Sequence, residues 1–200
     1  MRAFLDFEAS SLAKASYPIE VAWVFEDGLS ESYLLKPLPE WTDWSERAQA
    51  IHGITRATLE AEGHPVAVVA SRALEVLGGH DLYASSPSWD GKWLSVLLRA
   101  GGLPRHALRL KDTDEVQLDA ALAALASKVA PEALEATAKA IVAKVRAAAE
   151  SRPIAHRALA DAEQERRIWL EITDEALRAV EAQRDAASGN GRPRGSTGSP

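Results

Sequence analysis

The sequence contains no cysteine, and this absence excludes three kinds of chemistry. A chain without thiols has no disulfide framework, no thiolate zinc site and no cysteine nucleophile. The sequence also lacks an apolar run near the roughly 18–20 residues that cross a bilayer, so we expect no membrane-embedded function. Residues 1–6 end in Asp6, a carboxylate where a signal peptide needs apolar residues, which predicts a cytoplasmic protein.

Basic residues are outnumbered, with 23 Lys and Arg against 29 Asp and Glu, and the formal net charge is −6. This acidic balance argues against an extended surface that binds nucleic acid through many phosphates. At roughly 100–200 residues per domain, the 200 residues fit one domain, with or without an appendage. A chain of this size buries about 70% of its unfolded surface, so its core needs no disulfide for stability.

Apolar runs and turn signals place strands first in the chain and helices afterwards. The nearly continuous apolar run at residues 19–25 predicts a buried strand, and residues 26–28 predict a turn. The predicted strands are residues 2–7, 19–25, 30–36, 80–85 and 107–111, and the predicted helices are residues 45–52, 55–62, 65–77, 90–99, 115–127, 131–151 and 158–184. This order of elements predicts an α/β sheet. Gly, Ser, Pro, Asn and Arg dominate residues 187–200, so we expect a disordered tail after a domain of residues 1–186.

Two carboxylates, Asp6 and Glu8, fall at the end of the first predicted strand. Side chains alternate across a strand, so both carboxylates face the same side while Phe7 points into the core. Neighbouring carboxylates repel each other, which implies exposure to water, a bound cation or a raised pKa. Taken alone, a strand end that reaches water explains this pair equally well.

Two further segments place polar side chains where helices are predicted to begin. Asp90 opens the helix expected after the fourth strand, and capping of that helix is a sufficient reason for it. His156 and Asp161 have the spacing His-x4-Asp at the start of the last predicted helix. An acid there interacts favourably with the helix dipole, so neither segment alone requires a catalytic role.

Together, the three segments supply four carboxylates and one histidine, in the order Asp-x-Glu, Asp and His-x4-Asp. Carboxylate oxygens are the ligands that hard divalent cations prefer. Two metal ions held about 3.5–4 Å apart can activate a water molecule and stabilise the leaving oxygen of a phosphodiester. A neutral histidine nearby can accept the proton of that water.

This pattern resembles the DEDD superfamily of 3′–5′ exonucleases over roughly residues 2–175. The superfamily includes the proofreading subunit of bacterial replicative polymerase, oligoribonuclease and ribonuclease T. The spacing from His156 to Asp161 is similar to that of the histidine branch, DEDDh. Residues 51–55 are similar to the His-Gly-Ile segment of the family, and Asp112 and Thr113 add to the likeness.

The resemblance implies a ribonuclease H-like fold, with a mixed five-stranded sheet flanked by helices. It implies that residues 1–186 form an exonuclease domain, which removes nucleoside 5′-monophosphates from the 3′ ends of single-stranded DNA or RNA. It also implies two Mg²⁺ or Mn²⁺ ions in each active site and a homodimer. The catalytic residues it implies are the metal ligands Asp6, Glu8, Asp90 and Asp161 and the general base His156.

The sequence differs from the family at positions where family members contact the substrate. Family members often have Thr-Gly-Leu after the first motif and His-Asn before the second, and Trp89 replaces a more usual phenylalanine. The positions that correspond to these motifs are Ser10, Ser11 and Leu12, and then Ser85 and Ser86. We expect substrate contacts from Ser10, Ser11, Leu12, His52 and Trp89.

Three alternatives stay open at the level of sequence. The chain could be a catalytically weak or inactive module that keeps the fold and binds nucleic acid or a partner protein. An active enzyme could prefer DNA or RNA. It could also act as a free-standing nuclease or as a proofreading subunit.

Overall fold

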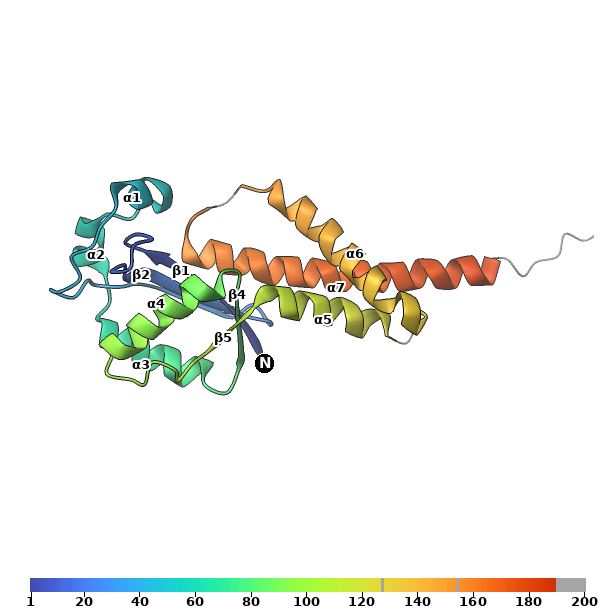
Figure 1. The fold of residues 1–200 in the computed structure, drawn as a ribbon, viewed down its shortest axis with the longest axis horizontal. Coiled ribbons are helices and arrows are strands. Elements are labelled where there is room, and N and C mark those ends of the chain that lie inside the picture. Colours follow the sequence, from blue (N-terminus) through green and yellow to red (C-terminus); the bar gives the residue numbers. More distant parts are fainter. Residues whose placement is uncertain (127, 154, 190–200) are drawn as a thin grey trace, which may run out of the picture.

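A five-stranded sheet with helices on both faces forms the centre of the protein, as the computed structural model shows for residues 1–126, 128–153 and 155–189 (Figure 1). The strands are β1 (Arg2–Ala9), β2 (Pro18–Phe25), β3 (Ser30–Leu34), β4 (Asp81–Ala84) and β5 (Leu110–Asp112). The helices are α1 (Glu46–His52), α2 (Arg56–Glu62), α3 (Val66–Leu77), α4 (Pro87–Ala100), α5 (Thr113–Leu125), α6 (Pro131–Glu150) and α7 (Ala158–Gly189). The strand order is β3-β2-β1-β4-β5. Because β1 pairs antiparallel with β2 and parallel with β4, the sheet is mixed, which confirms that prediction.

Several elements begin or end elsewhere than the sequence predicts. β1 continues to Ala9, so Asp6 and Glu8 lie inside the strand rather than at its end. α4 begins at Pro87, because proline suits the first turn of a helix, and Asp90 therefore lies within that turn instead of capping it. α7 continues through residues 187–189, and residues 190–200 of the predicted tail lie outside the described residues.

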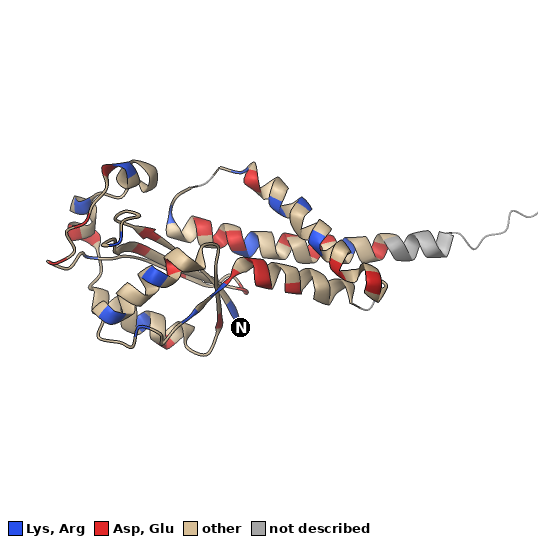
Figure 2. Cartoon of the chain, viewed as in Figure 1, with Lys and Arg blue, Asp and Glu red and all other residues tan. Residues whose placement is uncertain are grey.

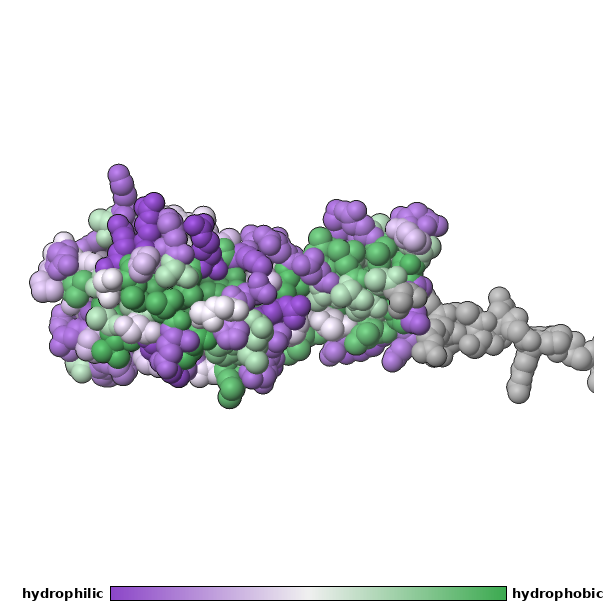
Figure 3. Space-filling model, turned by 90° about the horizontal axis from the view of Figure 1, so that it is seen from below, coloured by the Kyte–Doolittle hydropathy of each residue, from purple (hydrophilic) through white to green (hydrophobic). Residues whose placement is uncertain are grey.

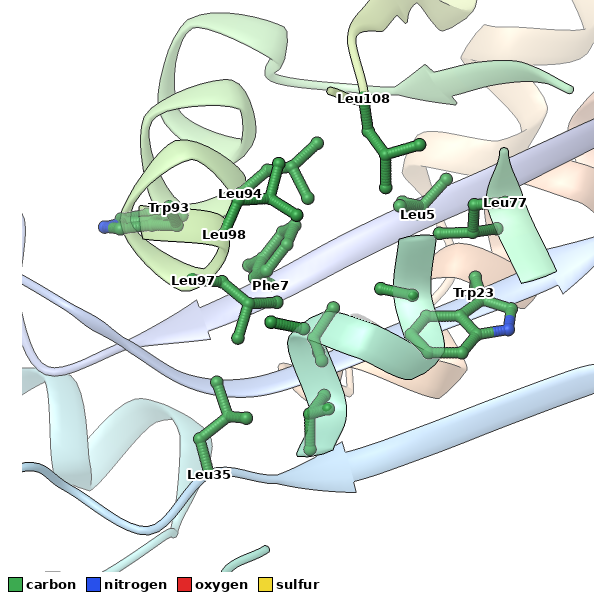
Figure 4. Close-up of a cluster of buried hydrophobic side chains, with 14 of the residues drawn as sticks. Leu5, Phe7, Trp23, Leu35, Leu77, Trp93, Leu94, Leu97, Leu98 and Leu108 are labelled. Atoms are coloured by element: carbon green, nitrogen blue, oxygen red, sulfur yellow. The ribbon is translucent and has the colours of Figure 1, made fainter. Parts of the chain in front are cut away.

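The alternation of side chains along β1 separates the core from the polar residues. Phe7 joins the larger hydrophobic core beneath α3 and α4, and it lies against Leu94, Leu97 and Leu98 of α4 (Figure 4). Phe4 points to the opposite face and packs with residues of α5 and α7 in a smaller cluster. Asp6 and Glu8 share the face of Phe4, which the strand geometry dictates, so their carboxylates lie on the side of the sheet that α7 covers.

The helices α5, α6 and α7 extend past the sheet as a helical projection (Figure 1). The first half of α7 packs on the sheet, and its second half joins a separate core that includes Leu125, Ile141, Val145, Ile172 and Val180. Figure 3 shows apolar residues on the surface of this projection, where several side chains of the core are only partly covered. Among the described residues, no helix combines the length and apolar character needed to span a membrane.

Most helices of the described chain carry both basic and acidic residues. Figure 2 shows this mixture along α6 and along the described part of α7, whereas α5 carries acidic residues alone. Many of the charged residues form ion pairs between neighbouring elements, such as Arg72 with Glu31 and Arg152 with Glu171.

Candidate active site

A cavity of about 280 Å³ brings the predicted chemical residues together. Its walls come from β1, from the loop after β1, from the first turns of α4 and from the segment that leads into α7. The lining residues are Asp6, Phe7, Glu8, Leu12, Ser86, Trp89, Asp90, Trp93, His156 and Asp161. All four candidate carboxylates and the candidate base therefore face one space, although the sequence places them far apart.

Three of the carboxylates form a compact cluster. Asp6, Glu8 and Asp161 each offer one oxygen, and these atoms all lie within 4.8 Å of one another. Asp6 and Glu8 come from one face of β1, and Asp161 comes from the first turn of α7, which crosses that face. Asp90 is outside this cluster of three but lines the same cavity.

Burial and mutual repulsion disfavour the charged forms of these carboxyl groups. Burial raises the pKa of Asp6 well above its usual value, and the charges of Asp90, Glu8 and Asp161 raise it further. Burial, together with the charge of Asp161, raises the pKa of Glu8 to about 7. Burial also raises the pKa of Asp90 to about 7 and the pKa of Asp161. A cation in the cavity would relieve this repulsion.

The donor set fits a hard divalent cation. It consists of carboxylate oxygens, which Mg²⁺ and Mn²⁺ prefer. The Oδ2 atom of Asp90 is buried and has no hydrogen-bond partner among the described residues. Buried polar atoms are normally satisfied, so this unpaired oxygen on a residue that lines the cavity fits a role of Asp90 in holding a cation.

His156 lies in the segment between α6 and α7, just before α7 begins, and its side chain is half-buried in the cavity wall. Its backbone has φ of 50°, and it is the one non-glycine residue with positive φ in the described chain. This left-handed conformation is rare for residues with a side chain and needs support from surrounding contacts.

The residues predicted to contact substrate fall into two groups. Leu12 and Trp89 line the cavity, whereas Ser10, Ser11 and His52 do not. The hydroxyl groups of Ser10 and Ser11 donate hydrogen bonds to the carboxylate of Asp43. These two serines therefore hold the loop after β1, and their role in substrate binding stays a prediction.

His52 is buried at the end of α1, where its Nδ1 atom accepts a hydrogen bond of 3.0 Å from the backbone of Ile54. Its pKa is lowered chiefly because burial disfavours the charged ring. The histidine therefore holds the turn that follows α1, and a contact with substrate stays a prediction.

Sequence reasoning did not assign two residues near the site, Trp93 and Glu20. Trp93 lines the cavity, as does Ser86 of the second motif, and Glu20 lies opposite Glu8 in the pairing of β1 with β2. The sequence does single out Glu20, because it is a charged residue inside an otherwise apolar strand that is predicted to be buried. Such a charge requires a partner, which its own segment does not contain.

The raised pKa values predict an unusual dependence of stability on pH in metal-free protein. Glu8 and Asp90 bind protons more tightly in the folded protein, where their pKa values are about 7, than in the unfolded chain. Their contribution to stability is therefore complete below the usual carboxyl pKa of about 4 and is lost as the pH rises through about 7. Glu8→Gln has no titrating group at this position. At pH 8 its unfolding midpoint should therefore be about 5 °C higher than that of wild type, and at pH 5 the difference between the two midpoints should be smaller.

Thermal unfolding in EDTA at both pH values measures this difference. Glu31→Gln is a control, because the pKa of Glu31 is lowered, chiefly by hydrogen bonds from Arg72. A midpoint difference between Glu8→Gln and wild type that is the same at pH 5 and pH 8 would contradict the prediction.

No family model matches the sequence, and no curated protein sequence matches it. Solved structures do match. E. coli exonuclease I with bound zinc ion and single-stranded DNA aligns over 92% of this chain and 42% of that chain, with a TM-score of 0.61 and 17% identity. Its complex with a dA16 oligonucleotide covers 91% of this chain and 41% of that chain, with a TM-score of 0.60 and 16% identity. Apo exonuclease I covers 96% of this chain and 45% of that chain, with a TM-score of 0.59 and 15% identity.

This chain spans less than half the length of the exonuclease I chains that it matches. At identities this low, the likeness establishes the fold and nothing finer. The five-stranded mixed sheet with its flanking helices is the ribonuclease H-like fold that these exonuclease structures share.

Proposed function

We propose that this protein is a metal-dependent 3′–5′ exonuclease of the histidine branch of the DEDD superfamily. It hydrolyses the terminal phosphodiester of single-stranded DNA or RNA and releases nucleoside 5′-monophosphates. The observation that carries this proposal is the convergence of four carboxylates and His156 on one cavity. The likeness in fold to exonuclease I, which was solved with single-stranded DNA, supports the same class of substrate.

Each of the five residues has a distinct task. Asp6, Glu8, Asp90 and Asp161 would hold two divalent cations, Mg²⁺ or Mn²⁺. When bound, such ions make a water molecule more acidic and stabilise the departing 3′ oxygen. His156 accepts the proton of the attacking water at an imidazole nitrogen, so the base and the carboxylates must face the same scissile phosphate.

Trp89 provides an aromatic surface at the edge of the cavity. Its side chain is 37% exposed, and its ring stacks on Trp93 with the centroids 5.6 Å apart. Lys92 lies over the same ring, with Nζ 5.1 Å from the centroid. The ring is thereby held in one orientation, ready to stack on a base near the scissile bond.

Trp89→Ala is expected to raise KM for short oligonucleotides roughly tenfold, because stacking on an aromatic side chain is worth about 1–3 kcal/mol per base. Steady-state cleavage of single-stranded oligonucleotides measures this change. Trp89→Phe keeps a ring that can stack, and should stay within about threefold of wild type. Equal KM values for Trp89→Ala and wild type would exclude the stacking role.

A product assay on matched DNA and RNA oligonucleotides, with Mn²⁺ or with EDTA, tests the proposed function. We expect mononucleotides to be released from the 3′ end with Mn²⁺ and not with EDTA. The same assay compares the two sugars. If oligonucleotides labelled at the 3′ end stay intact with excess Mn²⁺, the protein is not this nuclease.

The alternative is a module that keeps the fold and binds nucleic acid or a protein partner without cleavage. Ser11, Ser85 and Ser86 differ from the residues that the family has at these positions, and these differences favour the alternative. The Ser11 hydroxyl, for example, donates a hydrogen bond to Asp43. Calorimetric titration with Mn²⁺ separates the two, because a binding module needs no paired divalent ions. A homodimer, a cytoplasmic location and service as a proofreading subunit stay predictions from the resemblance.

A further inference from the structure

Glu20 is a carboxylate buried within the sheet beside the candidate active site. It lies on β2 directly opposite Glu8 of β1, and its side chain is 3% exposed. A buried carboxylate destabilises the fold unless charged and hydrogen-bonded partners compensate it. The partners of Glu20 therefore indicate why the chain tolerates a charge in this strand.

Within the described part of the chain, the hydrogen-bond partners of the Glu20 carboxylate are Arg157 and Ala158, where α7 begins. Arg157 donates two hydrogen bonds, from Nε at 3.0 Å and from Nη2 at 2.7 Å, one to each oxygen of the carboxylate. The backbone N–H of Ala158 donates a third, of 3.0 Å. Ala158 is the first residue of α7, so Glu20 also satisfies an N–H group that has no partner within the helix.

These bonds hold the two residues that follow His156. His156 has the left-handed backbone described above, and Arg157 comes next in the chain. The backbone N–H of Asp161 in turn donates to the carbonyl of Arg157 at 3.0 Å. Glu20 thus ties the segment that carries His156 to the strand beside Asp6 and Glu8.

A second ion pair in the fold has the same form but lies away from the cavity. Arg72 of α3 donates two hydrogen bonds to Glu31 of β3, at 3.0 Å and 2.8 Å. Neither residue lines the cavity with the carboxylates. This pair also fastens a helix to the sheet, so it is a matched control for an effect on folding alone.

We propose that Glu20 is a positioning residue: through Arg157 and Ala158, it holds the imidazole of His156 where it meets the attacking water. This inference rests on the proposed function, because it assigns the positioned group as the base. A displacement of about 1 Å at a catalytic group can lower a rate about 100-fold. Glu20 can therefore affect the reaction without contact with substrate.

The test compares Glu20→Gln, which removes the charge and keeps the size, with Glu31→Gln. We expect Glu20→Gln to lower kcat by about 10- to 100-fold and to leave KM within about twofold. In the His156→Ala background, Glu20→Gln should lower kcat no further, because the residue through which it acts is absent. Glu31→Gln should lower kcat in neither background.

An NMR measurement, which does not depend on enzyme activity, complements the kinetic test. The ring carbon-bound proton of His156 gives an NMR signal, which is assigned by its loss in His156→Ala. This signal should shift or broaden in metal-free Glu20→Gln and stay unchanged in Glu31→Gln. If Glu20→Gln does not fold, Arg157→Lys changes the half-exposed partner and gives the same two readouts.

The outcomes are distinct. An unchanged His156 signal in Glu20→Gln overturns the inference, and so does a further loss of kcat in the His156→Ala background. If the wild-type protein cleaves no oligonucleotide, the proposed function fails. The NMR signal then still decides whether Glu20 orients the ring of His156.

Discussion

Asp6→Asn is expected to abolish nuclease activity and, at the same time, to stabilise the metal-free protein. Asp6 lies in the compact cluster with Glu8 and Asp161, and the charge of Asp90 also acts on it. Asparagine has the same shape but carries no charge, so it removes both a metal ligand and a source of repulsion. We expect the rate to fall by at least about 1,000-fold, because bound metal supplies several kcal/mol of transition-state stabilisation.

Two measurements on Asp6→Asn check these opposite effects. Cleavage of single-stranded oligonucleotides with Mn²⁺ measures the loss of activity. Thermal unfolding in EDTA at pH 8 should show a midpoint a few degrees above wild type, about 2–4 °C for each kcal/mol. Asp119→Asn replaces an exposed acid of α5 and should change neither quantity. Full activity in Asp6→Asn would refute the assignment of Asp6 as a metal ligand.

His156→Ala should lower kcat by about 100- to 10,000-fold, the usual contribution of a general base, with little change in KM. The fold should tolerate this change, since the side chain is half-buried and is absent from the hydrophobic clusters. Single-turnover cleavage isolates the chemical step, and thermal unfolding checks stability. His106→Ala is the control, because His106 is exposed and lies outside the cavity.

A kcat within about threefold of wild type would exclude His156 as the base. The two variants should also differ in metal binding. Mn²⁺ titration should give a weaker response for Asp6→Asn, because a ligand is lost. The titration curve of His156→Ala should resemble that of wild type, because the carboxylates are intact.

The local parts of the fold were predictable from sequence because they depend on neighbouring residues. The alternation around Phe7 was sufficient to assign Asp6 and Glu8 to one face of β1, and the apolar run of β2 identified a buried strand. The ends of elements were less predictable. Pro87 starts α4 earlier than expected, and it places Asp90 within the first turn.

Apart from the site residues that the family resemblance implies, contacts between side chains of distant segments could not be predicted from the sequence. Glu20 is an evident anomaly in an apolar strand, yet its partner Arg157 is 137 residues away. Ser10 and Ser11 stay predicted substrate contacts, and the hydrogen bonds that their hydroxyl groups donate to Asp43, in a later loop, did not follow from the sequence. In both cases tertiary structure decides which polar groups meet.

The docking of α7 on β1 also has a kinetic consequence. β1, β2 and β3 follow one another in sequence and can pair through short connections, whereas Asp161 joins Asp6 and Glu8 through contacts between distant segments. Contacts of this kind form slowly, because the entropy of closing a long loop must be overcome first. The cluster of Asp6, Glu8 and Asp161 is therefore complete only at a late step of folding. An ion that bound only after β1 and α7 have met would slow unfolding more than it speeds folding.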